Sequence, residues 1–341
     1  MTPDGKLGIG LLSFAHVHAR GYADQVRDIT DCAVVGVWDE DAARGSAEAE
    51  RRGATFHESY EELLALPDLD AVIVNAPTSM HRELICAAAK AGKHIFTEKS
   101  LTVTLEDATA VMHAVEESGV KFVISLPSRV RPEILFAKRV LDMGYLGEVT
   151  QMRTRIAHMA ALDRWFSGGS AWFTDEKAAG GGAFFDLGCH RIDVMRWFLG
   201  EPASVVAQMA NTSQVYDIDD NMAALITFRN KAIGMIDVSW VHRYGPNPLE
   251  IYGTDGYLSI DAGAPNAPKI QLISGQLKAG DILGYISPAS LPPAPPSLMH
   301  QWVSAINTGS TCATSIYDGW NLVQLLEGCY MAGREGREVT F

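Results

Sequence analysis

The chain has 341 residues, a length at which two packed domains are a better expectation than one. Hydrophobic residues make up 47% of it and charged residues 20%, which is typical of folded globular proteins and excludes a disordered or low-complexity chain. The formal net charge of -13, with no run of lysine and arginine to offset it, disfavours binding to nucleic acid or to an anionic membrane surface.

The first third of the chain alternates short apolar runs with longer amphipathic stretches. This pattern predicts a parallel sheet built from strand-helix-strand units. Strands are expected at residues 7–12, 33–38, 54–56, 71–75, 94–97 and 121–125, the third being the weakest. Helices are expected at residues 41–52, 82–91 and 105–118, and Gly92 and Gly119 follow the last two in the capping position. Residues 1–125 are therefore predicted to form a doubly wound, Rossmann-type domain.

After residue 125 the strands follow one another through short turns. Successive strands of this kind predict a largely antiparallel, open sheet. Strands are expected at residues 149–156, 205–210, 223–228, 232–240 and 249–253, and helices at residues 132–143, 185–199, 299–307 and 319–331. The proline-rich residues 291–296 are expected to run as an extended connector. Residues 126–341 are thus predicted to form a second, α+β domain, so that the whole chain is α/β with two domains.

The number of cysteines and the length of the apolar runs indicate the cellular compartment in which we expect the protein. Five cysteines, an odd number without a C-x-x-C pair, predict neither a disulfide framework nor a zinc ribbon. No basic segment followed by an apolar one opens the chain, and no run of about 18 apolar residues occurs. We therefore expect a cytoplasmic protein with reduced thiols that does not associate with a membrane.

Two sequence frames compete for a phosphate-binding turn near the first strand. Gly8-x-Gly10-x-x-Ser13 matches the glycine fingerprint more literally, but Ser13-x-Ala15-x-x-His18 follows a strand of full length. We prefer the second frame, although Ser13 and Ala15 replace glycines that allow a tight turn and a close approach to pyrophosphate. Backbone N–H groups around His16 and Val17 would then bind the anion at the start of the next helix. A strand-turn-helix that binds nothing remains the alternative.

Asp39 closes the second predicted strand, somewhat beyond the usual distance of about 20 residues after the turn. A carboxylate there accepts hydrogen bonds from both ribose hydroxyls and repels a 2′-phosphate, which favours NAD over NADP. Arg44, about one helical turn later, keeps NADP open. The alternative is an ordinary exposed acid in a turn.

Three segments make this general picture specific. They are NAPTSMH at residues 75–81, AGKHIFTEK at residues 91–99 and GGGAFFDLGCHRID at residues 180–193. In their order and spacing they resemble the Gfo/Idh/MocA oxidoreductase family, named for glucose-fructose oxidoreductase and inositol dehydrogenase. The resemblance covers nearly the whole chain. Ser13, Ala15 and Ser100 depart from it, and Ser100 stands where the family has a proline after Glu-Lys.

The resemblance implies roles for individual residues. Lys99 faces the substrate, Asp186 and His190 handle the proton, and Arg129 and Asp193 contact substrate hydroxyls together with them. The second domain is implied to bind the substrate and to assemble the chain into a homodimer or homotetramer. With the turn and Asp39, the expected cofactor contacts are Ser13, Phe14, Ala15, His16, Val17, Asp39, Ala76, Pro77, Thr78, His81, Glu98 and Lys99.

The residues themselves carry chemistry that agrees with these roles. Oxidation of an alcohol needs a proton acceptor, and a histidine such as His190 suits this near neutral pH. Asp186, four residues earlier on the same helix face, can orient the imidazole, and Lys99 can stabilise the developing alkoxide. For the spacing alone a solvated helix face is the better explanation, but the glycine run before the helix and the family resemblance reverse that preference. A metal site is the other alternative, but hydride transfer beside a lysine needs no Lewis acid, so we expect no metal.

Neighbouring residues have simpler interpretations. Cys189 is adjacent to His190 and therefore points about 100° away from it on a helix, so we expect a packed thiol rather than a nucleophile. Four aromatic residues before the glycine run could cover a sugar ring or could simply pack in a core: Trp165, Phe166, Trp172 and Phe173.

The leading hypothesis is thus an NAD-dependent dehydrogenase or reductase that acts on a small carbohydrate, inositol or related polyol. Two alternatives remain open from the sequence. One is a redox-neutral enzyme of the same fold that uses bound NAD to cleave glycosides. The other is a non-catalytic nucleotide-binding protein, which the substitutions Ser13, Ala15 and Ser100 would fit.

Overall fold

A computed structural model describes residues 1–260, 270–277, 284–286 and 291–341. The chain forms two compact units, each assembled from segments that are far apart in the sequence. The first unit consists of Met1–Leu126, Ser167–Gly180 and Pro296–Val323, and the second of Pro127–Phe166, Gly181–Pro295 and Gln324–Phe341. Two segments beyond residue 125 therefore fold with the first unit. The division into a cofactor domain and a substrate domain stays a prediction.

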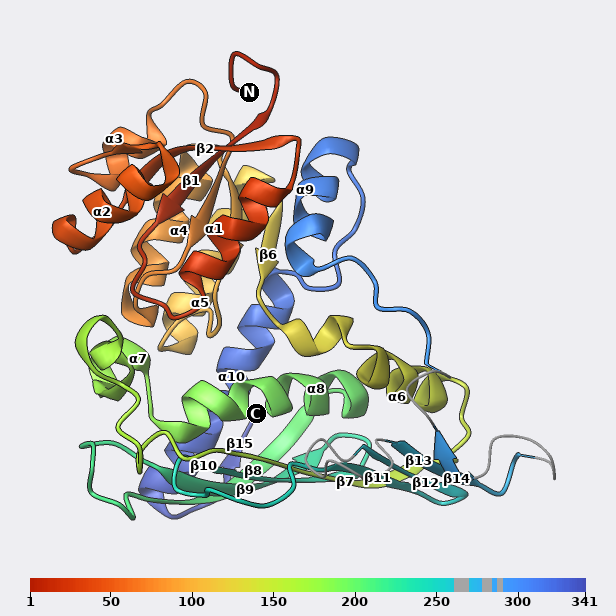
Figure 1. The fold of residues 1–341 in the computed structure, drawn as a ribbon. Helices are drawn as coiled ribbons and strands as arrows, with labels where there is room; N and C mark the ends of the chain where they lie inside the picture. The colour runs from red at the N-terminus through yellow and green to blue at the C-terminus, as the bar shows by residue number, and fades with distance from the viewer. Residues whose placement is uncertain (261–269, 278–283, 287–290) are drawn as a thin grey trace. The chain divides into compact units, whose positions relative to one another are not determined.

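The first unit contains a six-stranded parallel sheet in the order β3-β2-β1-β4-β5-β6 (Figure 1). Its strands are β1 Leu7–Leu12, β2 Cys32–Trp38, β3 Thr55–Phe56, β4 Ala71–Val74, β5 His94–Thr97 and β6 Phe122–Ile124. All residues of β1 and β4 are buried, as expected of central strands in a parallel sheet with helices on its faces. The order places β1 beside β4, which confirms the predicted doubly wound fold.

The helical segments of this unit lie between these strands or in the two later segments that join the unit. They are α1 Ala19–Asp28, α2 Ala42–Arg52, α3 Tyr60–Leu64, η1 Thr78–Met80, α4 His81–Lys90, α5 Leu105–Ser118, η3 Gly168–Thr174, α7 Glu176–Ala179 and α9 Leu298–Thr308. Helices α4 and α5 pack together, as do α1 and α9. The Thr104 hydroxyl caps α5 by accepting from the Asp107 N–H, and Gly119 ends the helix in the left-handed conformation.

The second unit contains a nine-stranded sheet in the order β14-β13-β12-β11-β7-β10-β9-β8-β15. Its strands are β7 Val149–Ala157, β8 Pro202–Ala210, β9 Asn221–Phe228, β10 Ile233–Ser239, β11 Leu249–Gly253, β12 Gly256–Ile260, β13 Ile270–Ser274, β14 Gly284–Ile286 and β15 Val339–Thr340. Within this sheet β7 and β10 pair in parallel, and the other neighbours are antiparallel. This confirms the predicted, largely antiparallel sheet.

Helix α8 lies along one face of this sheet, against β7 and β10 (Figure 1). Apart from η3, α7 and α9, the described helical segments after residue 126 are η2 Pro127–Val130, α6 Pro132–Asp142, the π-helix η4 Phe184–Gly188, α8 Cys189–Leu199 and α10 Ile316–Glu335. The burial of β9 alternates, because its even-numbered residues from Met222 to Phe228 pack inward. Among the helices that the structure describes, none is long and apolar enough to cross a membrane.

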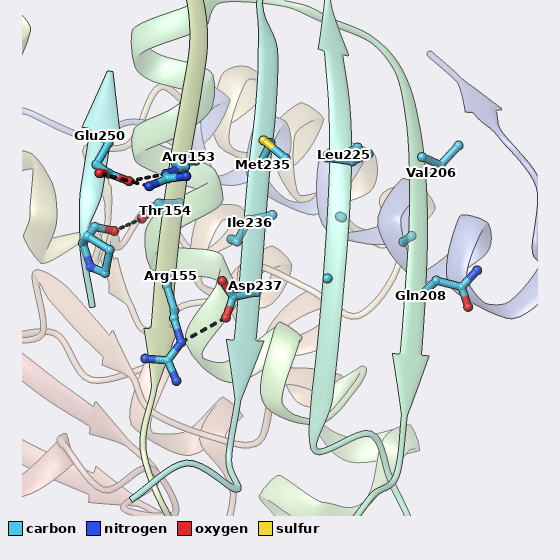
Figure 2. A pocket seen from close by; sticks show the side chains of 14 residues that line it. Arg153, Thr154, Arg155, Val206, Gln208, Leu225, Met235, Ile236, Asp237 and Glu250 are labelled. Carbon is cyan, nitrogen blue, oxygen red and sulfur yellow. Dashed lines mark hydrogen bonds and ion pairs between the residues drawn. The ribbon is translucent and has the colours of Figure 1, made fainter. Parts of the chain in front are cut away.

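The opposite face of the nine-stranded sheet is open. Apolar side chains stand on it, with Val206 of β8 41% exposed and Leu225 of β9 44% exposed. A hollow of about 540 Å³ runs across β11, β7, β10, β9 and β8, and Figure 2 shows the side chains that line it. Two ion pairs, Arg153 with Glu250 and Arg155 with Asp237, lie along the side of the hollow formed by β7.

Candidate active site

The turn after β1 adopts the conformation of a glycine turn without a glycine. Ser13 has a φ of 73° and is fully buried, and its hydroxyl accepts a hydrogen bond from the Ala15 N–H at 3.0 Å. The turn therefore follows the Ser13-x-Ala15 frame, whereas Gly8 and Gly10 lie inside β1. A side chain at Gly8 would collide with the Asp68 carbonyl, so packing accounts for that glycine.

Helix α1 begins at Ala19 with His18 as its N-cap, slightly later than the sequence suggests. The His16 N–H donates to the Asn75 carbonyl at 3.0 Å and is thus used within the protein. Of the two N–H groups that we named as anion donors, that of Val17 therefore fits the role better.

The carboxyl ends of β1 and β4 form the point at which the strand order reverses. Dinucleotides bind at this place in doubly wound sheets. Asn75 follows β4 there, fully buried, and neither atom of its amide makes a hydrogen bond with any residue that the structure describes. A buried polar group without a partner costs about 1–3 kcal/mol, so a polar ligand at this edge would stabilise it. These residues fit a bound dinucleotide.

Asp39 is committed to protein partners. Its fully buried carboxylate accepts from the Phe14 N–H and the Asp41 N–H, both at 2.8 Å. Arg44 binds it through Nε at 2.9 Å and Nη2 at 2.6 Å, and also pairs with Glu40. The Arg44 side chain is 19% exposed and that of Asp39 is 0% exposed, so Arg44 is the more accessible of the two charges.

Glu98, at the end of β5, is the centre of a buried hydrogen-bond network. Its carboxylate accepts from the Lys99 N–H at 2.9 Å and from the Tyr22 hydroxyl at 2.5 Å, and it lies 2.8 Å from His18 Nδ1. Burial alone would raise the pKa of Glu98, but His16, His18 and Lys99 outweigh it and hold that pKa well below its usual range. Glu98 is therefore ionised at neutral pH.

The sequence reasoning missed Tyr22, whose only signal was its place one turn after His18. The side chains of His16, His18 and Glu98 offer ligand atoms within 4.8 Å of one another, a spacing that could hold a metal ion. Because Glu98 already accepts several hydrogen bonds, the network also stands without one.

Lys99 is 6% exposed and is the second residue after β5, and its peptide bond to Ser100 is cis. His81 holds the loop that follows. Its Nδ1 lies 3.1 Å from the Ser100 carbonyl and its Nε2 lies 3.0 Å from the Ala76 carbonyl, so it links the loops after β4 and β5. Burial lowers the pKa of His81. Its contact with a cofactor stays a prediction, as does that of Pro77 and Thr78.

The segment from Ser167 to Gly180 packs on the turn after β1. The Trp172 indole N–H donates to the Ala15 carbonyl at 3.1 Å. Phe173 stacks on Trp172 with ring centroids 4.0 Å apart and lies 5.3 Å from the His16 ring. Two of the four aromatic residues noted in the sequence thus belong to the first unit, beside the candidate cofactor turn.

In the second unit, Asp186 and His190 lie on one continuous helical segment. Asp186 is in the π-helix η4 and His190 in the first turn of α8, and both are half-buried. Residues four apart share a helix face, and π-helical turns are frequent at functional sites. The Trp240 indole N–H donates to the Asp186 carboxylate at 3.3 Å. Cys189 is fully buried, and its thiol donates to the Asp186 carbonyl.

The glycine run before this helix is held by Asp219. The Asp219 carboxylate accepts from the Gly182 N–H at 2.7 Å, the Phe184 N–H at 3.3 Å and the Tyr330 hydroxyl at 2.9 Å. A Cβ at Gly182 would lie 1.9 Å from the Asp219 carbonyl oxygen, so only glycine fits. Burial raises the pKa of Asp219 despite these donors. No motif in the sequence had singled out Asp219 or Tyr330.

Arg129 and Asp193 form a buried, bidentate ion pair. Arg129 Nε and Nη2 donate to the two carboxylate oxygens of Asp193 at 2.8 and 2.7 Å, and the guanidinium lies 4.4 Å above the Trp197 ring. The structure thus brings together both residues that the sequence assigned to substrate hydroxyls.

Known proteins are similar to this chain in fold and in sequence. Residues 7–126 match the oxidoreductase family described as having an NAD-binding Rossmann fold, and residues 134–259 match the GFO/IDH/MocA C-terminal domain. The chain belongs to the Gfo/Idh/MocA oxidoreductase family. It is 30% identical to scyllo-inositol 2-dehydrogenase (NAD(+)) of Bacillus subtilis over 285 residues, which cover 81% of this chain and 78% of that protein.

Two further relatives match over almost the full chain of this Gfo/Idh/MocA protein. D-apiose dehydrogenase of Paraburkholderia graminis is 26% identical over 98% of this chain and 88% of its own. The fold matches that of levoglucosan dehydrogenase in complex with NADH and L-sorbose, with a TM-score of 0.82, 22% identity and 98% of each chain covered. The cofactor of the family is NAD, which fits the edge of the sheet at Asn75.

Proposed function

We propose that this protein is a cytoplasmic, NAD-dependent dehydrogenase or reductase that acts on a secondary carbon of a sugar, inositol or related polyol. The observation that carries the proposal is the pair Asp186 and His190, which lie half-buried on one helix face. The helix follows a glycine run in which Gly182 leaves no room for a side chain. The named activities of the relatives support the substrate class. NADP remains an alternative cofactor because Arg44 is more accessible than Asp39.

Each residue of the proposed site has one task. His190 accepts the proton of the substrate hydroxyl, and Asp186 orients and stabilises the imidazolium that results. Lys99 stabilises negative charge on the same substrate oxygen, and the ionised Glu98 fixes its backbone N–H. Bound NAD supplies the acceptor for the hydride. Arg129 and Asp193 orient further hydroxyls of the substrate.

Turnover with purified protein tests the proposal. We expect NADH to form with at least one compound in a panel of sugars, inositols and anionic sugar derivatives. We expect His190→Ala and Lys99→Met to lower kcat by about 10²–10⁴-fold, the usual contribution of a positioned acid-base group. His113→Ala, which removes an exposed histidine, is the matched control and should leave kcat unchanged. Equal activity of all variants, or release of a free sugar without net NADH, would overturn the proposal.

We also propose that a second copy of this chain covers the open face of the nine-stranded sheet. Exposed Val206, Leu225 and Ile233 make that face apolar, and large apolar patches usually mark interfaces. Ion pairs such as Arg153 with Glu250 border the hollow and suit a polar rim. Sedimentation should show a homodimer or homotetramer that Leu225→Arg converts to monomer. A wild-type monomer at high concentration would contradict this.

A further inference from the structure

Helix α8 carries a buried arginine that forms no ion pair with an acid among the described residues. Arg191 follows His190 directly and is 9% exposed. Its Nη2 donates to the Asn247 carbonyl at 3.2 Å, and its Nε is buried without a hydrogen bond to any residue in the described part of the chain. The Asn247 side chain pairs with both backbone groups of Ala157, which fixes the carbonyl that Arg191 contacts. The guanidinium is therefore placed but incompletely satisfied.

The charges that act on Arg191 balance it only in part. Burial and, next to it, Arg131 lower the pKa of Arg191 to about 10, and Glu133 opposes them. Arg191 is still protonated at neutral pH. Glu133 is itself bound by Arg131, whose Nε donates to it at 2.8 Å. Two guanidinium groups thus share one carboxylate.

Other buried arginines of the same unit show what a structural arginine looks like here. Arg129 has the bidentate partner Asp193, and Arg196 pairs with Glu201 at 2.8 Å. A buried charge without such a partner is strongly unfavourable, because the desolvation is not compensated. Arg191 is therefore better explained by a ligand than by packing.

We propose that Arg191 and Arg131 form a subsite for an anionic group, a carboxylate or a phosphate, on the substrate. Arg131 stands two residues after Arg129, which pairs with Asp193, and Arg131 lies close enough to Arg191 to lower its pKa. The subsite therefore lies on the same segment as the residue pair expected to contact substrate hydroxyls. Guanidinium groups bind carboxylate and phosphate with directed, charge-assisted hydrogen bonds. This inference rests on the proposed function and narrows its substrates to anionic sugar derivatives.

Calorimetric titration of the NAD-loaded protein tests the subsite, with inorganic phosphate and D-glucuronate as separate probes and D-glucose as the neutral reference. We expect at least one anionic probe to bind about tenfold or more tightly than D-glucose, as a charged hydrogen bond predicts. Arg191→Met should abolish this preference. The matched control Arg27→Met, an exposed arginine of α1, should keep it. The two anionic probes distinguish a phosphate subsite from a carboxylate subsite.

Misfolding would not hide the answer. Replacing an unpaired buried charge by methionine should leave the melting temperature unchanged or raise it. If Arg191→Met nevertheless lowers the melting temperature, Arg131→Gln, a substitution at a half-exposed residue, tests the same anion preference. No anion preference in the wild type, or an equal preference in Arg191→Met and wild type, overturns the subsite. Arginine-dependent anion binding without any NADH formation would keep the subsite and refute the proposed function instead.

Discussion

Substituting Tyr330 by phenylalanine removes a single oxygen from the support of the proposed catalytic helix. The Tyr330 hydroxyl donates to the Asp219 carboxylate at 2.9 Å and accepts from the Phe185 N–H at 3.1 Å. All three groups are buried, and the ring also packs beside Phe184 and Phe185. The substitution keeps the ring and therefore isolates the two hydrogen bonds.

The magnitude follows from the two groups that lose a partner. A hydrogen bond to a charged group contributes about 1.5–3 kcal/mol, and a buried N–H left without an acceptor costs about 1–3 kcal/mol. Because a water molecule can partly fill the vacated space, we expect a net loss of about 2–4 kcal/mol in the free energy of unfolding. The melting temperature should fall by about 5 °C or more in a protein of this size.

The loss should depend on pH. Burial raises the pKa of Asp219, so the folded protein holds this proton more tightly than the unfolded chain does. The contribution of this carboxyl to stability is therefore largest at acidic pH and is lost as the pH rises through the folded pKa. The Tyr330 hydroxyl opposes the rise in pKa. Its removal should thus cost more at about pH 7 than at about pH 4.5.

Thermal or urea unfolding at both pH values measures these effects. Tyr317→Phe is the matched control, because it removes an exposed tyrosine hydroxyl that also donates to a glutamate, Glu116, and it should change stability little. If Tyr330→Phe proved as stable as this control at neutral pH, the hydroxyl would not support the glycine run. A deficit that shrank with rising pH would refute the reasoning about Asp219.

Further substitutions test the glycine run before η4, the strained position Lys231 and the pair Asp39 and Arg44 at the cofactor-binding edge of the sheet. In Gly182→Ala the new Cβ would lie 1.9 Å from the Asp219 carbonyl oxygen, so the second unit should fail to fold or the enzyme should lose kcat. The control Gly21→Ala adds a methyl group to α1 where there is free space, and it should raise the free energy of unfolding in urea by about 0.5–1 kcal/mol. Lys231→Gly should raise the melting temperature, because a φ of 72° is strained for lysine, and an unchanged temperature would contradict that. Arg44→Ala should free Asp39 and weaken NADPH relative to NADH by about tenfold in fluorescence titration, and an unaltered ratio would refute the role of Arg44.

Much of the fold could be predicted because it rests on local pattern. Apolar runs predicted all six parallel strands to within about one residue, and the helix over Asp186 and His190 was expected at nearly its observed bounds. Strands β12 to β15 were missed. They are short, and β15 pairs with β8, which lies more than 100 residues earlier, so their hydrogen bonds leave little local signal.

The candidate site divides in the same way. Sequence motifs identified Lys99, Asp186 and His190 as candidate site residues, because their residue types alone indicate their chemistry. Their supports were not visible. Tyr22 reaches Glu98 across 76 positions, and Tyr330 reaches Asp219 across 111. Single tyrosines and aspartates are common, and nothing in their surroundings shows that they will meet.

The sequence by itself determined the parallel and antiparallel character of the two sheets and the residue types that would carry the chemistry, because these follow from periodicity and local chemistry. Only the tertiary structure decided which charges are satisfied. It pairs Asp39 with Arg44 and Asp193 with Arg129, and it gives Arg191 no ion pair within the described ranges of the chain. The physical reason is that desolvation and pairing depend on neighbours brought together from distant segments, and no local pattern records them.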